Sequence, residues 1–131
     1  MTATDILFRP FELGTLQLAN RIVMAPMTRN KSPGNIPGPQ VVEYYRRRAA
    51  GGVGLIITEG TCINHIAASG YPDVPYFHGA ERLAGWKRVA EAVHAEGGKI
   101  APQLWHCGGM RKAGTPPEGD VDGYTPSGMN V

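Results

Sequence analysis

The chain has 131 residues, enough for one small domain, and its 42% apolar and 18% charged residues are ordinary for a globular protein. A net charge of +2 without a basic stripe argues against a nucleic-acid partner, and no apolar run is long enough to cross a membrane. Cys62 and Cys107 are too few for a disulfide framework, and residues 1–5 do not begin a signal peptide, so we expect free thiols in the cytoplasm.

The first half of the chain predicts a hairpin, a strand and a helix. Leu13–Asn20 is expected to form a short hairpin or turn, and Arg21–Ala25 a strand that is buried on both faces. A loop over Asn30–Pro39 leads to a helix over Pro39–Ala50, which glycines terminate. The Arg46–Arg48 triplet falls in this helix, and we interpret it as a solvated face. The apolar stripe of the helix is Val41, Val42, Tyr45 and Ala49.

The second half predicts two more strands separated by a helix. Gly54–Glu59 is an apolar run expected to form a buried strand, and Thr61–Gly79 is a long loop. A helix is expected over Ala80–Glu96, and the last strand over Lys99–Trp105. Because proline cannot donate to a strand ladder, we expect a bulge at Pro102. The buried stripe of the second helix is predicted to be Leu83, Trp86, Ala90 and Val93.

The alternation of strands and helices predicts an α/β fold with a parallel sheet and right-handed crossovers. Two architectures fit this order, a doubly wound sheet and a (β/α)8 barrel. The remaining stretch, Cys107–Val131, is rich in glycine and proline and is expected to be irregular. A closed barrel typically needs about 250 residues. We therefore expect further chain or a partner fragment to complete the sheet, because three strands leave two open edges.

Polar residues and glycines follow each predicted strand. Pro26–Arg29 comes after the first strand, Glu59–Thr61 after the second, and Gln103–His106 ends the third. The carboxyl ends of parallel strands meet at one edge of the sheet, and α/β folds bind their ligands at that edge. The sequence therefore predicts a binding site made from three strand ends.

The groups at these strand ends suggest an uncharged ligand edge. No Gly-rich dinucleotide motif or Walker loop is present. Thr28 offers a hydroxyl, Gln103 a carboxamide and Gly60 a bare backbone, and a carboxamide presents a donor beside an acceptor. This set matches a flat heterocycle that carries C=O beside N–H, such as the pyrimidine ring of a flavin. Simpler interpretations also stand: Gln103 supports a loop, Gly60 is a turn glycine, and Thr28 caps a turn.

A metal site and a role for the other histidines are not favoured. His106 and Cys107 are adjacent, so their side chains diverge on a strand, and no paired ligand spacing occurs. We therefore expect no metal. We expect His65, His78 and His94 to have no chemical role, with His94 on the surface of the second helix.

Several sequence motifs resemble those of the Old Yellow Enzyme family of flavin-dependent ene-reductases, in the same order and with similar gaps. The resemblance spans almost the whole chain. It is carried by Leu7–Phe11, Leu18–Arg29, Glu43–Tyr45, Gly54–Gly60, Tyr71–Pro75 and Gln103–His106. It implies that residues 1–131 are the N-terminal segment, about three β/α units with an N-terminal hairpin, of a single (β/α)8 TIM barrel that binds FMN at its C-terminal mouth.

The resemblance also implies roles for the residues at the strand ends. Thr28 corresponds to a hydroxyl that hydrogen-bonds the flavin near O4 and tunes its redox balance. The other implied cofactor-binding residues are Ala25, Pro26 and Met27 along the flavin, Gly60 with its backbone at the flavin edge, and Gln103 on the pyrimidine ring. Tyr71 and Trp105 are similar to residues that line the substrate pocket.

The implied reaction transfers a hydride from NADPH or NADH through FMN to the C=C bond of an α,β-unsaturated carbonyl or nitro compound. The small-molecule partner is thus an activated alkene, and a homo-oligomer is possible. The catalytic groups of the family, a His/Asn or His/His pair and a proton-donating tyrosine, are expected beyond Val131.

One departure from the family pattern and two rival functions remain. Cys107–Met110 stands where the family commonly has an arginine, and Arg111 follows later, so loop or phosphate contacts are expected to differ here. The chain is alternatively an inactive barrel fragment or an assembly subunit that needs a complementing chain. A third option is a related barrel reductase that acts on dienoyl thioesters or xenobiotics.

Overall fold

The computed structural model describes residues 4–112, 114–115 and 121–128. Its strands are β1 (Phe11–Leu13), β2 (Leu16–Leu18), β3 (Val23–Met24), β4 (Leu55–Cys62) and β5 (Lys99–Trp105). Its α-helices are α1 (Pro39–Ala50) and α2 (Ala80–Ala95), with short 3-10 turns η1 (Asp5–Phe8), η2 (Pro33–Asn35) and η3 (Gly108–Met110). The predicted irregular stretch Cys107–Val131 contains only η3 as regular structure among its described residues.

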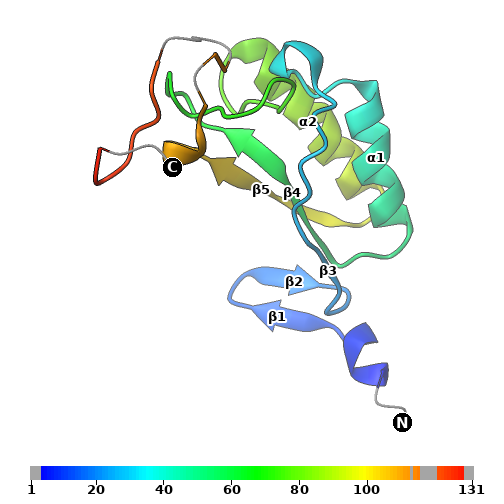
Figure 1. The fold of residues 1–131 in the computed structure, drawn as a ribbon. Helices are drawn as coiled ribbons and strands as arrows, with labels where there is room; N and C mark the ends of the chain where they lie inside the picture. Colours follow the sequence, from blue (N-terminus) through cyan, green and yellow to red (C-terminus); the bar gives the residue numbers. More distant parts are fainter. Residues whose placement is uncertain (1–3, 113, 116–120, 129–131) are drawn as a thin grey trace.

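The main sheet has the order β3-β4-β5, and both strand pairs are parallel. α1 connects β3 to β4, and α2 connects β4 to β5, so the predicted β-α-β-α-β order is confirmed. Both helices lie on one face of the sheet, while the β1–β2 hairpin lies apart from it near the start of β3 (Figure 1). The predicted hairpin is confirmed, but it lies two residues earlier, over Phe11–Leu18. Within the described residues, no helix is long and apolar enough to cross a membrane.

The core lies between the two helices and β4. It consists of Val41, Tyr45 and Ala49 from α1, Ile56 from β4, and Trp86, Val89 and Val93 from α2. The predicted stripe of α1 is confirmed for three of its members, while Val42 is half-buried.

The predicted stripe of α2 is wrong at Leu83, which is 44% exposed, and Ala90 is only half-buried. The helix instead buries Gly85 and Val89 beside Trp86 and Val93. A Cβ at Gly85 would lie 2.8 Å from the backbone oxygen of Pro37, so α2 approaches the chain closely on its glycine side. This close approach turns Leu83 away from the core.

The first predicted strand is shorter than expected, and the second is longer. β3 covers only Val23–Met24, and Val23 is 49% exposed, so the expectation of burial on both faces is wrong for the described chain. β3 pairs only with β4 among the described residues, so its other edge is open. β4 continues to Cys62, because Gly60, Thr61 and Cys62 pair with β5. The long loop therefore begins at Ile63.

The predicted irregularity at Pro102 is confirmed. Ile57 pairs with Ala101 and Gly60 with Gln103, so Thr58 and Glu59 together face Pro102 alone. The extra residue lies on β4, and the backbone N–H of Gln103 donates to the hydroxyl of Thr58 at 3.1 Å. The bulge shifts the alternation of β4, so that Ile56 and Glu59 both face the helices.

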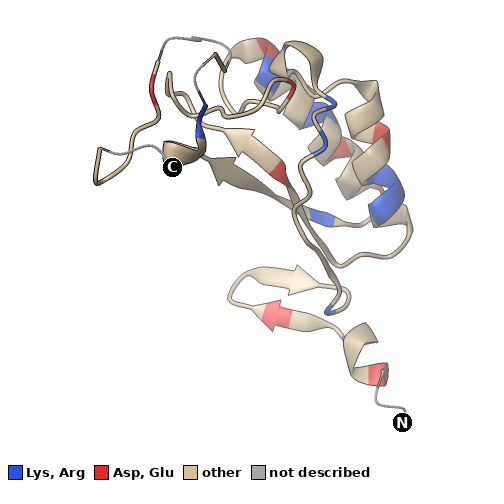
Figure 2. Cartoon of the chain, viewed as in Figure 1, with Lys and Arg blue, Asp and Glu red and all other residues tan. Residues whose placement is uncertain are grey.

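The Arg46–Arg48 triplet is divided among three environments on α1, which carries both charge signs as α2 does (Figure 2). Arg46 forms ion pairs with Glu43 and with Glu96, which follows α2. Arg48 lies over the ring of Tyr44, and Arg47 is exposed. The interpretation as a solvated face thus holds for Arg47, whereas Arg46 joins the two helices.

Candidate functional site

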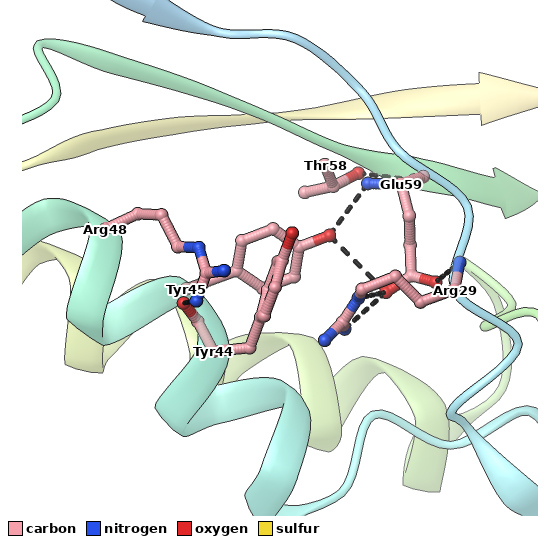
Figure 3. A network of polar contacts seen from close by, with 6 residues as sticks. All are labelled: Arg29, Tyr44, Tyr45, Arg48, Thr58 and Glu59. Atoms are coloured by element: carbon pink, nitrogen blue, oxygen red, sulfur yellow. Dashed lines mark hydrogen bonds and ion pairs between the residues drawn. The ribbon is translucent and has the colours of Figure 1, made fainter.

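A buried carboxylate ties the loop after β3 to the end of β4. The Glu59 side chain is fully buried, and the Arg29 guanidinium donates to its Oε1 at 2.6 Å. The backbone N–H of Arg29 donates to Oε2 of the same carboxylate at 3.2 Å. Figure 3 shows both groups meeting beside the hydroxyl of Tyr45. The pair is therefore charge-assisted and held at both carboxylate oxygens.

Two tyrosines of α1 complete this network. The Tyr45 hydroxyl accepts the backbone N–H of Glu59 at 2.7 Å and lies 3.4 Å from the Glu59 carboxylate. Burial raises the pKa of Tyr45 well above its usual value, so the phenol stays protonated and donates to that carboxylate. The Tyr44 ring lies between two guanidinium groups, with Arg29 at 3.6 Å and Arg48 at 3.5 Å from its centroid.

This network places Thr28 beside the end of β4. Because the N–H of Arg29 is bound to the Glu59 carboxylate, the loop that contains Thr28 is fixed against β4. Within the described residues the Thr28 hydroxyl has no hydrogen-bond partner, so the capping interpretation finds no support. The predicted tract of Ala25, Pro26, Met27 and Thr28 is exposed throughout.

Gln103 and Gly60 lie opposite each other in the register of β4 and β5. Gly60 is buried and Gln103 is half-buried. In the part of the chain that the structure describes, the Gln103 carboxamide makes no hydrogen bond, so it supports no loop there. Gly60 and Gln103, at the ends of two predicted strands, thus lie together, and the side chains of Thr28 and Gln103 have no hydrogen-bond partner among the described residues. Their individual roles stay predictions.

The two residues predicted to line a substrate pocket lie together. The Tyr71 and Trp105 rings are 5.8 Å apart between centroids and tilted by 40°. They border a hollow of about 190 Å³, whose other lining residues are His106, Cys107 and Met110. A larger apolar hollow of about 310 Å³ lies between α2 and β5, on the helix side of the sheet. We place the candidate site at the strand ends because the unpartnered polar groups lie there.

His65 and His106, whose contact no sequence pattern predicts, have facing nitrogens 3.0 Å apart. His106 accepts the N–H of Gly108 at Nδ1, so in its neutral form Nε2 carries the proton and donates to His65. The edge of the Tyr124 ring contacts His65, with centroids 5.1 Å apart. His65 therefore has a structural partner, while His94 is exposed on α2 as predicted. His78 stacks on Tyr76.

Arg111, which follows the departure from the family pattern, is buried and bound to backbone oxygens. It donates to the carbonyls of Ser69, Thr115 and Val121. These carbonyls come from the loop after β4 and from the stretch after η3. Arg111 thus holds two loops together at the end of the sheet.

Both cysteines are free thiols, as predicted. Burial raises the pKa of Cys62 to about 11 and also raises the pKa of Cys107, so both remain protonated at neutral pH. Neither thiol is suited to act as a nucleophile. Among the described residues, no three His, Cys, Asp or Glu side chains gather in a way that could hold a metal ion.

Comparison with known proteins places the chain among flavin enzymes. The model of the NADH:flavin oxidoreductase / NADH oxidase family matches residues 6–130. The chain is 45% identical over 102 residues to 12-oxophytodienoate reductase 7 of Oryza sativa subsp. japonica, covering 78% of this chain and 25% of that protein. It is 41% identical over 126 residues to an NADP-dependent oxidoreductase of Aspergillus flavus, covering 95% of this chain and 33% of that protein.

Solved structures agree with this placement. Morphinone reductase in complex with tetrahydroNAD superimposes with a TM-score of 0.81 at 45% identity, covering 88% of this chain and 31% of that chain. The Old Yellow Enzyme homologue of Zymomonas mobilis gives a TM-score of 0.72 at 37% identity, covering 78% and 28%. These structures are TIM barrels, so the predicted fold, part of a (β/α)8 barrel, is confirmed. The chain spans about a third or less of the length of these relatives.

Replacing Arg29 with alanine should destabilise the fold strongly. The substitution leaves the Glu59 carboxylate buried without its cation, which typically costs about 3–5 kcal/mol. Arg47→Ala removes an exposed arginine, which typically changes stability by about 0.5 kcal/mol or less. Urea unfolding of both variants measures the difference. Equal losses for the two variants would show that the buried ion pair contributes nothing specific.

Protonation of His106 should oppose its contact with Gly108, because Nδ1 then becomes a donor that faces the Gly108 N–H. Burial and, to a lesser degree, the neighbouring His65 lower the pKa of His106 below 6.5. The folded chain therefore favours neutral His106, and this contribution weakens as pH falls through about 6.5, where the unfolded chain takes up the proton. An NMR titration, assigned with His106→Asn, should give a midpoint below 6.5 that rises in His65→Asn. If the His106 midpoint is the same in His65→Asn as in the unchanged protein, the two histidines are not coupled.

Proposed function

Because the chain belongs to the NADH:flavin oxidoreductase / NADH oxidase family, which includes the Old Yellow Enzymes, we propose that it forms part of an FMN-dependent ene-reductase. The observation that carries this proposal is the edge of the sheet where Gly60 and Gln103 lie opposite each other, with Thr28 in the loop that Glu59 fixes against β4. Its hydroxyl and carboxamide have no partner within the described residues and match the C=O and N–H groups of a flavin ring.

The uncharged residues at the strand ends have the hydrogen-bonding groups that the edge of the FMN ring requires. Gln103 would hold the pyrimidine edge, and Thr28 would hydrogen-bond near O4. The exposed tract Ala25–Met27 would lie along the ring, and the backbone of Gly60 would meet its edge. When bound, FMN supplies the hydride exchange between the nicotinamide and the alkene. The protein's part is to orient the ring and to tune its electronics through these uncharged groups.

The proposed substrates are alkenes conjugated to a carbonyl or nitro group. Tyr71 and Trp105 border an apolar hollow beside the proposed flavin edge and would hold the body of such a molecule. The names of the relatives support a reductase, and they include 12-oxophytodienoate reductase and morphinone reductase. Either NADPH or NADH would be the hydride donor, since one relative is named NADP-dependent and one structure contains tetrahydroNAD.

We further propose that residues 1–131 are the N-terminal segment of a single FMN-binding barrel domain. Additional chain or a complementing fragment would cover the open edges of β3 and β5, which have no strand partner among the described residues. The proton donor and the groups that bind the substrate carbonyl would lie in that remainder. A cytoplasmic location fits two protonated free thiols, and a homo-oligomer is compatible with this arrangement.

The second candidate is an inactive fragment or an assembly subunit, which the same open edges favour. The complete protein that contains residues 1–131 should separate the two. An ene-reductase would purify with bound flavin, lose its yellow colour with NADPH or NADH in the absence of oxygen, and regain it when cyclohexenone is added. A colourless protein, or a reduced flavin that cyclohexenone does not reoxidise, would contradict the proposal. Cyclohexanone serves as the control without the C=C bond.

Gln103→Ala and Thr28→Ala should have separable effects in that complete protein. Removing the carboxamide should weaken flavin binding by about tenfold, the worth of roughly one hydrogen bond to a neutral group. Removing the hydroxyl near O4 should mainly change the reduction potential of the flavin. Equilibrium dialysis and redox titration measure the two quantities. Unchanged affinity in the first variant or unchanged potential in the second would remove that residue from the proposed site.

A further inference from the structure

Gly60 lies where no side chain could be added without moving Trp105. A Cβ built on Gly60 would lie 2.1, 2.2 and 2.4 Å from three atoms of the indole ring. Carbon atoms normally approach to about 3.5–4.0 Å. The backbone of Gly60 does not have a positive φ, so the chain conformation does not require glycine there. The indole ring supplies the reason for glycine at this position, and the interpretation as a turn glycine is wrong.

The half-buried Trp105 side chain is also packed on the side that faces the protein interior. It pairs with Cys62 in the strand register and packs against the buried cluster of Cys62, Ala68, Val74 and Tyr76. The Tyr71 ring faces it at 5.8 Å. The ring therefore cannot yield to a methyl group at Gly60 by sinking into the protein, because packed residues already occupy that space.

The open direction for the indole is the hollow that it borders with Tyr71, Cys107 and Met110. Met110 is 64% exposed, so this wall of the hollow is not packed. A second glycine shapes the same region, because a Cβ on Gly70 would lie 3.1 Å from the Cys107 sulfur. The absence of side chains at Gly60 and Gly70 thus determines the positions of Trp105 and Cys107.

We propose that Gly60 is a positioning residue that fixes the Trp105 ring and thereby the width of this hollow. The hollow then admits a bulky apolar substituent of the alkene. The part that concerns substrates rests on the proposed function, whereas the contact between Gly60 and Trp105 does not. Adding a methyl group at Gly60 drives the indole into the hollow and narrows it, so large substrates lose more than small ones.

The experiment compares Gly60→Ala, Trp105→Ala and the double variant in the complete flavin-loaded protein. Gly98→Ala is the matched control, because its Cβ would lie 2.8 Å from the Cβ of Ala49 and touch neither Trp105 nor the hollow. The first readout is the fluorine NMR signal of fluorotryptophan at position 105, assigned with Trp105→Phe. The second is the ratio of kcat/KM for benzylideneacetone to that for cyclohexenone, in which any loss of bound flavin cancels.

We expect Gly60→Ala to shift the Trp105 signal and to lower the ratio by about tenfold, the scale on which an apolar pocket discriminates size. Once Trp105 is alanine, adding Gly60→Ala should change the ratio no further, because the two residues act through one contact. Gly98→Ala should leave both readouts unchanged. If Gly60→Ala does not fold, folding of the double variant would support the same clash.

An unmoved Trp105 signal, or an effect of Gly60→Ala that persists in the Trp105→Ala background, would overturn the proposal. A moved signal with an unchanged ratio would overturn it too, since Trp105 would then not set the width for substrate. Failure of the proposed function looks different. The complete protein would then reduce neither alkene, while the fluorine signal would still show whether Gly60 holds the indole.

Discussion

The burial of one carboxylate organises this part of the chain. Glu59 cannot remain charged inside the protein without partners, and Arg29 and Tyr45 supply them. Arg29 comes from the loop after β3 and Tyr45 from the middle of α1, so one charge holds three elements in a fixed relation. The stacking of Tyr44 between Arg29 and Arg48 restricts the guanidinium further. The backbone of Thr28 is therefore held in place by its neighbour Arg29, although the Thr28 side chain itself is exposed.

The bulge in β4 makes this arrangement possible. In a regular strand, Ile56 and Glu59 would face opposite sides of the sheet because they are three residues apart. The extra residue opposite Pro102 brings both to the helix side, where Ile56 joins the core and Glu59 meets Tyr45. The next residue, Gly60, then shares the other face with Trp105. Pro102 on β5 thus lies opposite the point where the side chains of β4 change the face of the sheet to which they point.

Much of the architecture could be read from the sequence because it follows from local rules. The bounds of α1 and β5 match the prediction, since proline, paired glycines and apolar periodicity mark them. Leu83 was misplaced because periodicity cannot register a close approach at Gly85 to a distant backbone. The strand ends were found from residue types, whereas the Glu59 network and the His65–His106 contact join residues 14 to 41 positions apart in sequence. Only the folded chain reveals such long-range pairs.

The hydroxyl of Thr58 has an influence beyond its own position. It accepts the N–H of Gln103 and donates to the carbonyl of Glu59, so it joins the two strands where the ladder is interrupted. Thr58 itself is buried. A genetic screen for altered cofactor retention would therefore be expected to return substitutions at position 58, although that side chain lies beneath the surface that such a screen is meant to map.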